Sequence, residues 1–394
     1  MRDILFLAHR VPWPPDRGDK IRSWHLLRHL ARGARVHVAG FVEGEDIAAC
    51  TAALSPVAAS TTLVRRAKSR VVAAGEALAT GRPVSLTAFD SHALQRRVEA
   101  LLAAHPIDTI VVFSSQMAQY VPDEWPGRLI VDFVDVDSAK FAAYADAARG
   151  PMRWLMRREA RLLLAHDAAV AAHADASLFV SEAEAALFRK SAGAQRVHAV
   201  ENGIDVDRYD PATVAPVSAP HPLIVFTGQM DYRPNIDAVT VFADKVLPDL
   251  RADRPDLHFA IVGRAPTPAV QRLAERPGII VTGEVPDTRP WLAAADIVVA
   301  PLAIARGVQN KVLEAMAMAR PVLASPQAAE GIDHAGTIRV AELAEMAHAA
   351  RGLLENAGDL GVRTRARVAA RYGWNARLSA LDALLDADLA EAAE

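Results

Sequence analysis

Cysteine is almost absent from this chain, since Cys50 is the one cysteine among 394 residues. A single thiol excludes a disulfide framework, a multi-cysteine zinc site and an iron–sulfur cluster. Charge of one sign is not in excess either, because charged residues make up 23% of the chain and the formal net charge is -3. This balance excludes a disordered tail and a globally basic nucleic-acid-binding protein. We expect a cytoplasmic protein with no nucleic-acid partner.

Long apolar runs are also missing. The first run, residues 4–8, ends at His9 and is too short for the hydrophobic region of a signal peptide, so it predicts a first strand. The Ala-rich stretch 162–180 is interrupted by histidines and aspartates. No stretch approaches the roughly 20 apolar residues that a membrane-spanning helix needs. We therefore expect a soluble protein, or one that is peripheral at the inner face of the cytoplasmic membrane.

Two common nucleotide-binding motifs are lacking. The loop after the first predicted strand, residues 8–18, contains no G-x-G-x-x-G, and no lysine in the chain follows a glycine, so the P-loop is missing as well. Neither the H-E-x-x-H motif of metalloproteases nor the G-x-S-x-G motif of hydrolases occurs. Any nucleotide must therefore be bound by other means.

What the sequence does contain is an alternation of short aliphatic runs with helical patterns, which is typical of parallel βαβ units and predicts an α/β fold. Prolines and small residues interrupt this alternation at 205–222. We predict two Rossmann-like, doubly wound domains, residues 1–204 and 223–372, that face each other across a cleft. Residues 205–222 are the predicted hinge or linker, and residues 373–394 a C-terminal helix able to pack back on the N-terminal domain.

The most informative segment follows the predicted strand at 297–301. Gly307 precedes a helical pattern that carries Lys311 on its first turn and Glu314 one turn further. Unpaired N–H groups and the positive dipole end at such a helix start favour a diphosphate, and Lys311 adds a full charge. A carboxylate at position 314 can accept hydrogen bonds from ribose hydroxyls. The alternative is a capped surface helix with an incidental lysine.

Several short motifs accompany this segment: residues 313–317 (LEAMA) with Pro321-Val322, 201–205 (ENGID), 293–297 (AAADI) and 372–374 (YGW). With these motifs the sequence resembles the family 4 glycosyltransferases of the GT-B fold. Residues 230–235 (MDYRPN) and 307–314 (GVQNKVLE) are most similar to the sugar transferases associated with exosortase and exopolysaccharide systems.

The resemblance implies transfer of a sugar from a nucleotide-diphosphate donor, with retention at the anomeric carbon and without an obligatory metal. The nucleotide sugar is then a co-substrate, and no other cofactor is expected. The acceptor is expected to be a saccharide or a lipid-linked glycan in exopolysaccharide or cell-envelope glycan synthesis.

The resemblance also implies residue roles. Glu314 matches the family's ribose-binding Glu, whereas the Glu that contacts the sugar is replaced by Arg306. Gly228 matches the phosphate-loop glycine, and Arg233 is expected to replace the arginine that usually follows it. Together with Lys311, Arg233 would stabilise the leaving diphosphate. The predicted donor-binding residues are Gly18, Gly228, Arg233, Arg306, Gly307, Val308, Asn310, Lys311 and Glu314.

Acidic side chains gather at the end of the predicted strand 129–134, namely Asp132, Asp135 and Asp137. In the family this strand end often carries a histidine near the reacting carbon, so Asp135 is the predicted general base. The spacing of Asp135 and Asp137 also imitates the metal-binding D-x-D of the GT-A fold, but two Rossmann-like halves are not GT-A and no metal site is predicted. The alternative is that these acids cap the helix expected at 138–144.

A predicted helix opened by Pro151 carries a basic stripe. Arg153, Arg157 and Arg161 recur four residues apart, with Trp154 among them and apolar residues opposite. An aromatic residue among arginines suits an anionic membrane surface or the headgroup of a diphosphate lipid, so these four residues are acceptor or membrane candidates. The alternative is a solvated helix face.

Two other functions stay open on the sequence alone. A GT-B nucleotide-sugar epimerase would convert the donor without an acceptor. A non-catalytic GT-B protein would bind nucleotide or scaffold a polysaccharide complex, and Arg306 in place of the expected Glu favours that alternative.

Overall fold

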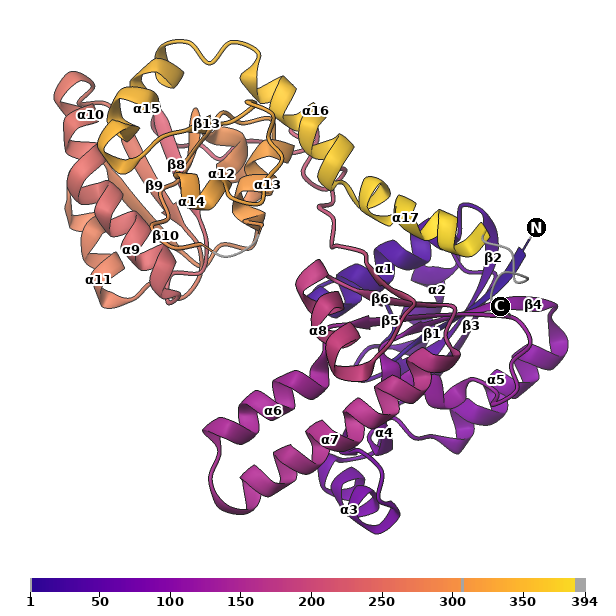
Figure 1. Ribbon diagram of the computed structural model, residues 1–394. Helices are drawn as coiled ribbons and strands as arrows, with labels where there is room; N and C mark the ends of the chain where they lie inside the picture. The colour runs from indigo at the N-terminus through magenta and orange to yellow at the C-terminus, as the bar shows by residue number, and fades with distance from the viewer. Residues whose placement is uncertain (1, 306–307, 387–394) are drawn as a thin grey trace. The chain divides into compact units, whose positions relative to one another are not determined.

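The computed structural model describes residues 2–305 and 308–386. Within them the chain forms two compact units, and each unit has its own sheet (Figure 1). The first unit contains residues 2–202 and 378–386, and the second contains residues 203–377. All strand pairs in both sheets are parallel, as short buried runs separated by helices require. The predicted α/β fold class is confirmed.

The sheet of the first unit has seven strands in the order β3-β2-β1-β4-β5-β6-β7. These strands are β1 (Arg2–Ala8), β2 (Ala34–Val42), β3 (Ser60–Arg65), β4 (Ile107–Phe113), β5 (Arg128–Val134), β6 (Ala176–Phe179) and β7 (Val197–Ala199). The helices are α1 (Gly18–Leu30), α2 (Ile47–Leu54), α3 (Arg70–Thr80), α4 (Val84–Thr87), α5 (His92–Ala104), the 3₁₀ turn Ser115–Tyr120, α6 (Asp137–Ala147), α7 (Gly150–His173) and α8 (Glu182–Ala192).

The sheet of the second unit has six strands in the order β10-β9-β8-β11-β12-β13. They are β8 (Leu223–Thr227), β9 (His258–Val262), β10 (Ile279–Gly283), β11 (Ile297–Ala300), β12 (Val322–Ala324) and β13 (Arg339–Val340). The helices are α9 (Arg233–Val241), a π turn (Phe242–Val246), α10 (Leu247–Asp253), α11 (Pro268–Gln271), a 3₁₀ turn (Arg272–Glu275), α12 (Arg289–Ala294), α13 (Asn310–Ala317), α14 (Pro326–Ala329), a 3₁₀ turn (Leu343–Glu345), α15 (Met346–Glu355) and α16 (Leu360–Tyr372).

Both sheets have the doubly wound strand order, in which the direction of winding reverses between two neighbouring strands. The reversal lies between β1 and β4 in the first sheet and between β8 and β11 in the second. Loops diverge at the carboxyl ends of such strands and leave a crevice in which ligands of this fold class bind. In the second unit, the segments that follow β8 and β11 therefore border this crevice.

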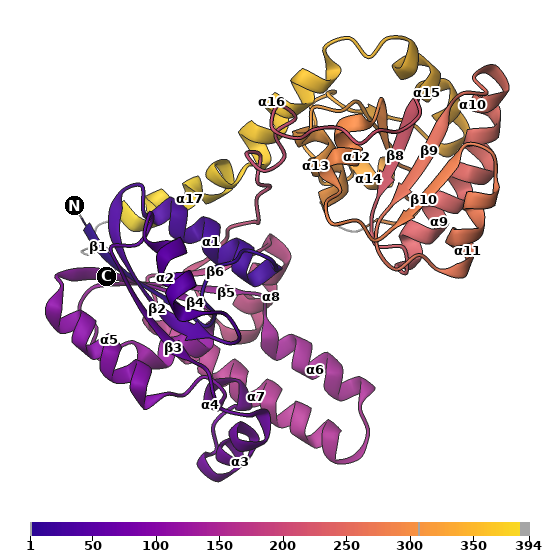
Figure 2. The same ribbon diagram turned by 180° about the vertical axis from the view of Figure 1, so that it is seen from behind.

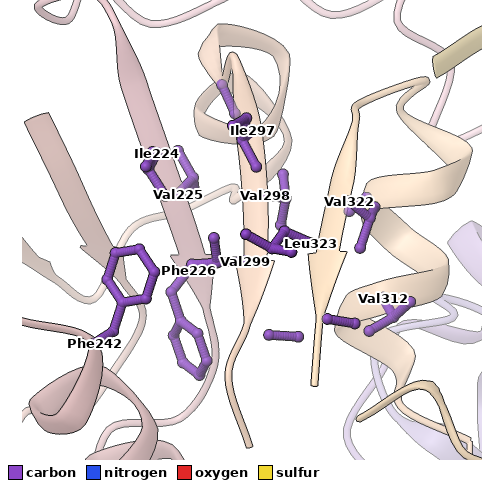
Figure 3. Packing of buried hydrophobic residues seen from close by; sticks show 14 of the residues in the cluster. Ile224, Val225, Phe226, Phe242, Ile297, Val298, Val299, Val312, Val322 and Leu323 are labelled. Carbon is purple, nitrogen blue, oxygen red and sulfur yellow. The ribbon is translucent and has the colours of Figure 1, made fainter. Parts of the chain in front are cut away.

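Packing fixes α13 at that edge of the second sheet. Its buried side chains face the sheet, and Val312 lies beside the side chains of β12 in Figure 3. Val312 and Leu313 are at most 4% exposed, and a fully buried side chain of this size contributes about 1.5–3 kcal/mol relative to an exposed one. The first turn of α13 is therefore held at the end of β11 by the core beneath it.

The proline-rich segment 205–222 forms neither helix nor strand, but it is not a free spacer. Arg365 of α16 donates hydrogen bonds to the carbonyl oxygens of Tyr209 at 2.7 Å and Val206 at 3.2 Å. Val206, Tyr209 and Val217 pack partly buried against the core of the second unit. The segment is thus part of the second unit, in contrast to the separate linker predicted from its prolines.

The last described helix, α17 (Trp374–Asp386), is divided between the two units, and residues 378–386 belong to the first. Its Asp382 Oδ1 lies 2.7 Å from His29 Nε2 of α1, and Arg128 donates to the carbonyl oxygen of Leu384. Among the described residues, no helix combines the length and the apolar character needed to cross a bilayer.

Candidate functional site

A pocket of about 530 Å³ opens at the carboxyl edge of the second sheet. It lies at the reversal point between β8 and β11, where this fold class binds ligands. Its walls come from the segments that follow β8, β9, β10 and β11 and from the first turns of α9 and α13. The lining residues are Thr227, Gly228, Gln229, Tyr232, Asn235, Gly263, Arg264, Glu284, Val285, Thr288, Val308, Gln309, Asn310, Lys311 and Glu314.

Lys311 supplies a cation in this pocket. Its Nζ donates a hydrogen bond to Asn235 Oδ1 and lies 4.3 Å from the centroid of the Phe226 ring. Burial lowers the pKa of Lys311 to about 8, although the nearby Glu314 carboxyl acts in the opposite direction. An anionic ligand placed beside Nζ would favour the charged form and be bound by it.

Two glycines make the wall next to Lys311 from bare backbone. A Cβ on Gly228 would lie 2.8 Å from Asn235 Nδ2 and 3.3 Å from Lys311 Nζ. A Cβ on Gly263 would lie 1.7 Å from the carbonyl oxygen of Gly228. A side chain at position 263 would collide with the backbone of the loop after β8, so the close approach of the loops after β8 and β9 requires glycine there. A side chain at position 228 would press against the side chains of Asn235 and Lys311.

Glu314 supplies an acceptor one turn beyond Lys311. It lines the pocket, and Tyr209 lies near its carboxyl group. Burial raises the pKa of Glu314 to about 7, against the opposing effects of Tyr209 and of the positive charges of Lys311 and Arg208. The pocket therefore combines a cation, exposed backbone and a carboxyl group poised between its two protonation states near neutral pH.

Arg264 and Glu284 are charged lining residues that the sequence analysis missed. Arg264 follows β9, and its Nη2 donates to Gln229 Oε1 at 3.1 Å; Glu284 follows β10. Their positions in the sequence could have indicated them. Each residue directly follows a glycine at the end of a strand, and the carboxyl ends of parallel strands lie at one edge of their sheet.

Arg233 is not brought into the pocket. It opens α9, but its side chain is 83% exposed and its Nε donates to Asp237 Oδ2 at 2.9 Å along the same helix. Arg264 is the better placed guanidinium, because it lines the pocket. The expected role of Arg233 as a phosphate ligand stays a prediction.

The other predicted donor residues have mixed positions. Val308 and Asn310 line the pocket with Lys311 and Glu314, whereas Arg306 and Gly307 lie outside the described residues. Gly18 is in the first unit at the start of α1, where a Cβ would meet nothing within 4 Å. Local packing therefore does not require glycine at position 18.

The three acids after β5 have different partners. Asp132 forms a buried ion pair with Arg22, 2.7 Å between oxygen and Nε, and so has a structural role. Asp135 and Asp137 share Lys140, whose Nζ lies 2.8 Å and 3.1 Å from their oxygens. Val134, before Asp135, has a φ of 71°, which is strained for a β-branched residue.

The side chain of Asp135 is 34% exposed, so it is accessible. The helix that follows it, α6, has no side-chain cap at its N-cap residue. The N-cap residue is Val136, so neither Asp135 nor Asp137 caps α6 from that position. The role of Asp135 as a general base stays a prediction.

The basic stripe lies on α7, which runs beside α6 and away from the sheet (Figures 1 and 2). Arg153, Arg157 and Arg161 are exposed, and Trp154 between them is 59% exposed. The apolar face predicted opposite them is only partly buried, because Met152 is 52% exposed. The first turns of α7 therefore expose apolar as well as basic side chains, in contrast to the two-sided helix expected.

Metal ligands were not expected in this chain. Within residues 2–305 and 308–386, no group of three or more His, Cys, Asp or Glu side chains is arranged to hold a metal ion. The metal independence of any reaction stays a prediction.

Comparison with known proteins identifies the second unit. Residues 221–356 match the family described as Glycosyl transferases group 1. The chain is 30% identical over 215 residues to phosphatidyl-myo-inositol mannosyltransferase of Propionibacterium freudenreichii subsp. shermanii. That match covers 51% of this chain and 53% of the relative, so it spans about half of the relative's length.

Solved structures are similar over almost the whole chain. The structure of HepE from Anabaena in complex with UDP has a TM-score of 0.58 at 15% identity, covering 98% of this chain and 99% of that one. Sucrose-phosphate synthase from Thermosynechococcus elongatus has a TM-score of 0.56 at 16% identity, covering 98% of each chain. The chain therefore has the two-domain GT-B fold, with a glycosyl transferase group 1 domain in its second unit.

Proposed function

We propose that this protein is a glycosyltransferase that moves a sugar from a nucleoside-diphosphate donor to a saccharide or lipid-linked glycan. The observation that carries the proposal is the placement of Lys311 and Glu314 one helical turn apart beside the Gly228 backbone. Ammonium and backbone N–H groups suit a diphosphate, and an ionised carboxylate suits the two hydroxyls of a ribose. The group 1 domain and the UDP complex of the structurally similar HepE support it.

The chemistry required of the second unit is stabilisation of the leaving diphosphate. Negative charge grows on the leaving oxygen as the bond to the sugar breaks. The Lys311 ammonium and the N–H groups at the start of α13 are fixed in place before the reaction and need no reorganisation. We expect this arrangement to replace a metal ion. The resemblance to family 4 supports retention at the anomeric carbon, and exopolysaccharide or cell-envelope glycan synthesis as the setting.

A transfer assay tests this function directly. Purified full-length protein is incubated with nucleotide sugars of UDP, GDP, ADP and TDP, alone or with saccharide and lipid-linked acceptors. Acceptor-dependent release of a nucleoside diphosphate is expected, and it should be abolished in Lys311→Ala but kept in Lys245→Ala, which removes an exposed lysine. Conversion of the donor alone would indicate an epimerase. Binding without turnover over the whole panel would indicate a non-catalytic protein.

We also propose that the exposed end of the α6–α7 pair contacts an anionic membrane surface. Arg153, Arg157 and Arg161 make no ion pair with any residue that the structure describes. Trp154 and Tyr144, 59% and 60% exposed, lie on the same pair of helices. Unpaired arginines beside exposed aromatic rings fit a surface of anionic headgroups, where a lipid-linked acceptor would be found.

Vesicle co-sedimentation tests this contact. Wild type is expected to bind vesicles containing phosphatidylglycerol and not vesicles of phosphatidylcholine alone. A charge reversal at the surface, Arg157→Glu, should weaken binding about 5- to 30-fold, since each basic residue near such a surface contributes about 1 kcal/mol and the reversal adds repulsion. The matched control is Arg96→Glu, an exposed arginine on α5. Equal loss in both variants, or no binding by wild type, would contradict the proposal.

A further inference from the structure

The first unit has a pocket of its own, with a volume of about 530 Å³. It is formed by the turn that follows β4, the loop that leads into β5 and the last turns of α7. Its volume is within the range of about 300–1,000 Å³ that is typical of small-molecule sites. Apolar side chains line it together with Asp123, Trp125, His166 and His173.

This pocket lies toward the amino edge of the first sheet. Leu129, one of its lining residues, is near the amino end of β5, whereas Asp135 directly follows the carboxyl end of that strand. A strand rises about 3.3 Å per residue, so about 20 Å of chain separates the two residues. The pocket is therefore remote from the predicted general base.

The Trp125 ring is held in place in the pocket wall. Its Nε1 donates a hydrogen bond to the carbonyl oxygen of Arg128 at 3.1 Å, and the side chain packs partly buried against the core of the first unit. Gly127 lies close to the ring, since a Cβ there would be 2.8 Å from Trp125 Cζ2. An aromatic ring that is already fixed offers a flat apolar surface and loses little freedom when a ligand binds.

Backbone contacts assign the ring nitrogens of the two histidines. His166 Nε2 lies 3.2 Å from the carbonyl oxygen of Ser115. His173 Nδ1 lies 2.9 Å from the carbonyl oxygen of Ala169. A carbonyl oxygen can only accept, so these nitrogens carry the proton, and each neutral ring keeps its other nitrogen as an acceptor. Burial and the positive charge of Arg82 lower the pKa of His166, against the hydrogen bond to Ser115, and favour its neutral form.

The polar groups that remain for a ligand are therefore acceptors. Asp123 is exposed and adds a carboxylate to the lining. The Gln119 amide is used within the protein, because its Nε2 donates to the carbonyl oxygen of Gln116 at 2.6 Å and its Oε1 accepts from Arg82 at 2.8 Å. A ligand that matches this pocket has several hydroxyl donors and a flat apolar face. A pyranose sugar has both.

We propose that this pocket binds pyranose residues of a saccharide, with one face of a sugar against the Trp125 ring and hydroxyl groups donating to the histidines and Asp123. The choice of a sugar among hydroxyl-rich ligands rests on the proposed function, which supplies a glycan as acceptor. The site itself goes beyond that function, because it uses only the first unit and no nucleotide. A glycan bound here is held at a point remote from its reacting end.

Nuclear magnetic resonance of the indole N–H groups tests the site directly. The chain has 6 tryptophans, and the signal of Trp125 is identified by its loss in Trp125→Phe. Full-length protein is titrated with maltotriose, cellotriose, mannotriose and galactobiose in the absence of nucleotide. We expect at least one of these saccharides to shift the Trp125 signal in a saturable manner.

Two variants test the contacts. His173→Ala should bind the saccharide about three- to tenfold more weakly, as expected for one lost hydrogen bond. The matched control is His92→Ala, which removes another exposed histidine, at the start of α5, and should bind like wild type. Trp125→Ala should weaken binding by about tenfold or more. Because His173 is exposed, its variant keeps the test valid even if Trp125→Ala does not fold.

The outcomes separate this site from the proposed function. No shift of the Trp125 signal with any saccharide, or shifts confined to other indole signals, would overturn the inference. Equal affinities in His173→Ala and His92→Ala would overturn it as well. A protein that binds a nucleoside diphosphate but no saccharide at Trp125 loses only this inference. One that binds the saccharide at Trp125 but no nucleoside diphosphate loses only the proposed function.

Discussion

Asp167 on α7 is a buried carboxyl group whose Oδ1 has no hydrogen-bond partner. Burial raises its pKa to about 7, although the nearby Ser115 acts in the opposite direction. A carboxyl group whose pKa is raised in the folded state binds more protons there than in the unfolded chain, whose pKa is about 3.9. The contribution of Asp167 to the free energy of unfolding is therefore expected to fall as the pH rises from about 4 to 7.

Replacing Asp167 with asparagine removes this buried charge while keeping the size and shape of the side chain. Asp167→Asn is expected to raise the free energy of unfolding at pH 8 by about 1–3 kcal/mol, and by much less at pH 5, where the acid is protonated. Urea unfolding at both pH values measures the difference. An equal effect at the two pH values would show that the carboxyl group is not the source of the pH dependence.

Asp135 and Asp137 form a matched pair for testing the general base, because they share Lys140 and differ in position. Asp135→Asn is expected to lower turnover by about 100-fold or more, with donor affinity near that of wild type, since a general base acts in the transition state. Asp137→Asn should keep turnover close to wild type. Steady-state kinetics with saturating donor measures both. Full activity in Asp135→Asn would contradict the role of Asp135 as general base. The ion pair with Lys140 would then be the role of Asp135 that the structure supports.

Among single elements, buried strands were the easiest to predict. The sequence predicts strands at 223–227 and 258–262, and β8 and β9 have these same bounds, because each is a nearly continuous apolar run. The helical pattern at 236–250 predicts a single helix, whereas the structure has α9, a π turn and α10 in this region. Pro248, at the start of α10, has no N–H for the continuing helix. The two-residue β13 has exposed side chains and no apolar run to reveal it.

The buried face of α13 holds this helix against the sheet. Shortening a buried side chain on that face should therefore lower the stability of the second unit. Leu313→Ala is expected to lower the free energy of unfolding by about 2–4 kcal/mol, through lost burial and the cavity left behind. The control, Val362→Ala on the exposed side of α16, should change it by less than about 0.5 kcal/mol. Chemical denaturation of both variants is the measurement. A small effect of Leu313→Ala would mean that other contacts hold the helix.

For the molecule as a whole, the periodicity of the sequence was sufficient to predict two Rossmann-like halves, and the fold class is confirmed. The positions of the predicted elements also indicate one wall of the pocket. Gly228 follows a predicted strand, and Lys311 and Glu314 lie near the start of a predicted helix. The other walls depend on how loops distant in sequence meet. Arg264 reaches the pocket through tertiary packing. The exposed side chain of Arg233 instead pairs with Asp237 along its own helix and does not line the pocket.

The proposed function of the whole molecule depends on a nucleoside-diphosphate site in the second unit that works without a metal. Calorimetric titration with UDP, GDP, ADP and TDP in the presence of a chelator tests it most directly. We predict micromolar binding of one diphosphate, weakened by about 1.5–3 kcal/mol, or roughly 10- to 150-fold, in Lys311→Ala and clearly reduced in Glu314→Ala. No binding of any diphosphate, or affinity unchanged in both variants, would contradict the proposed function.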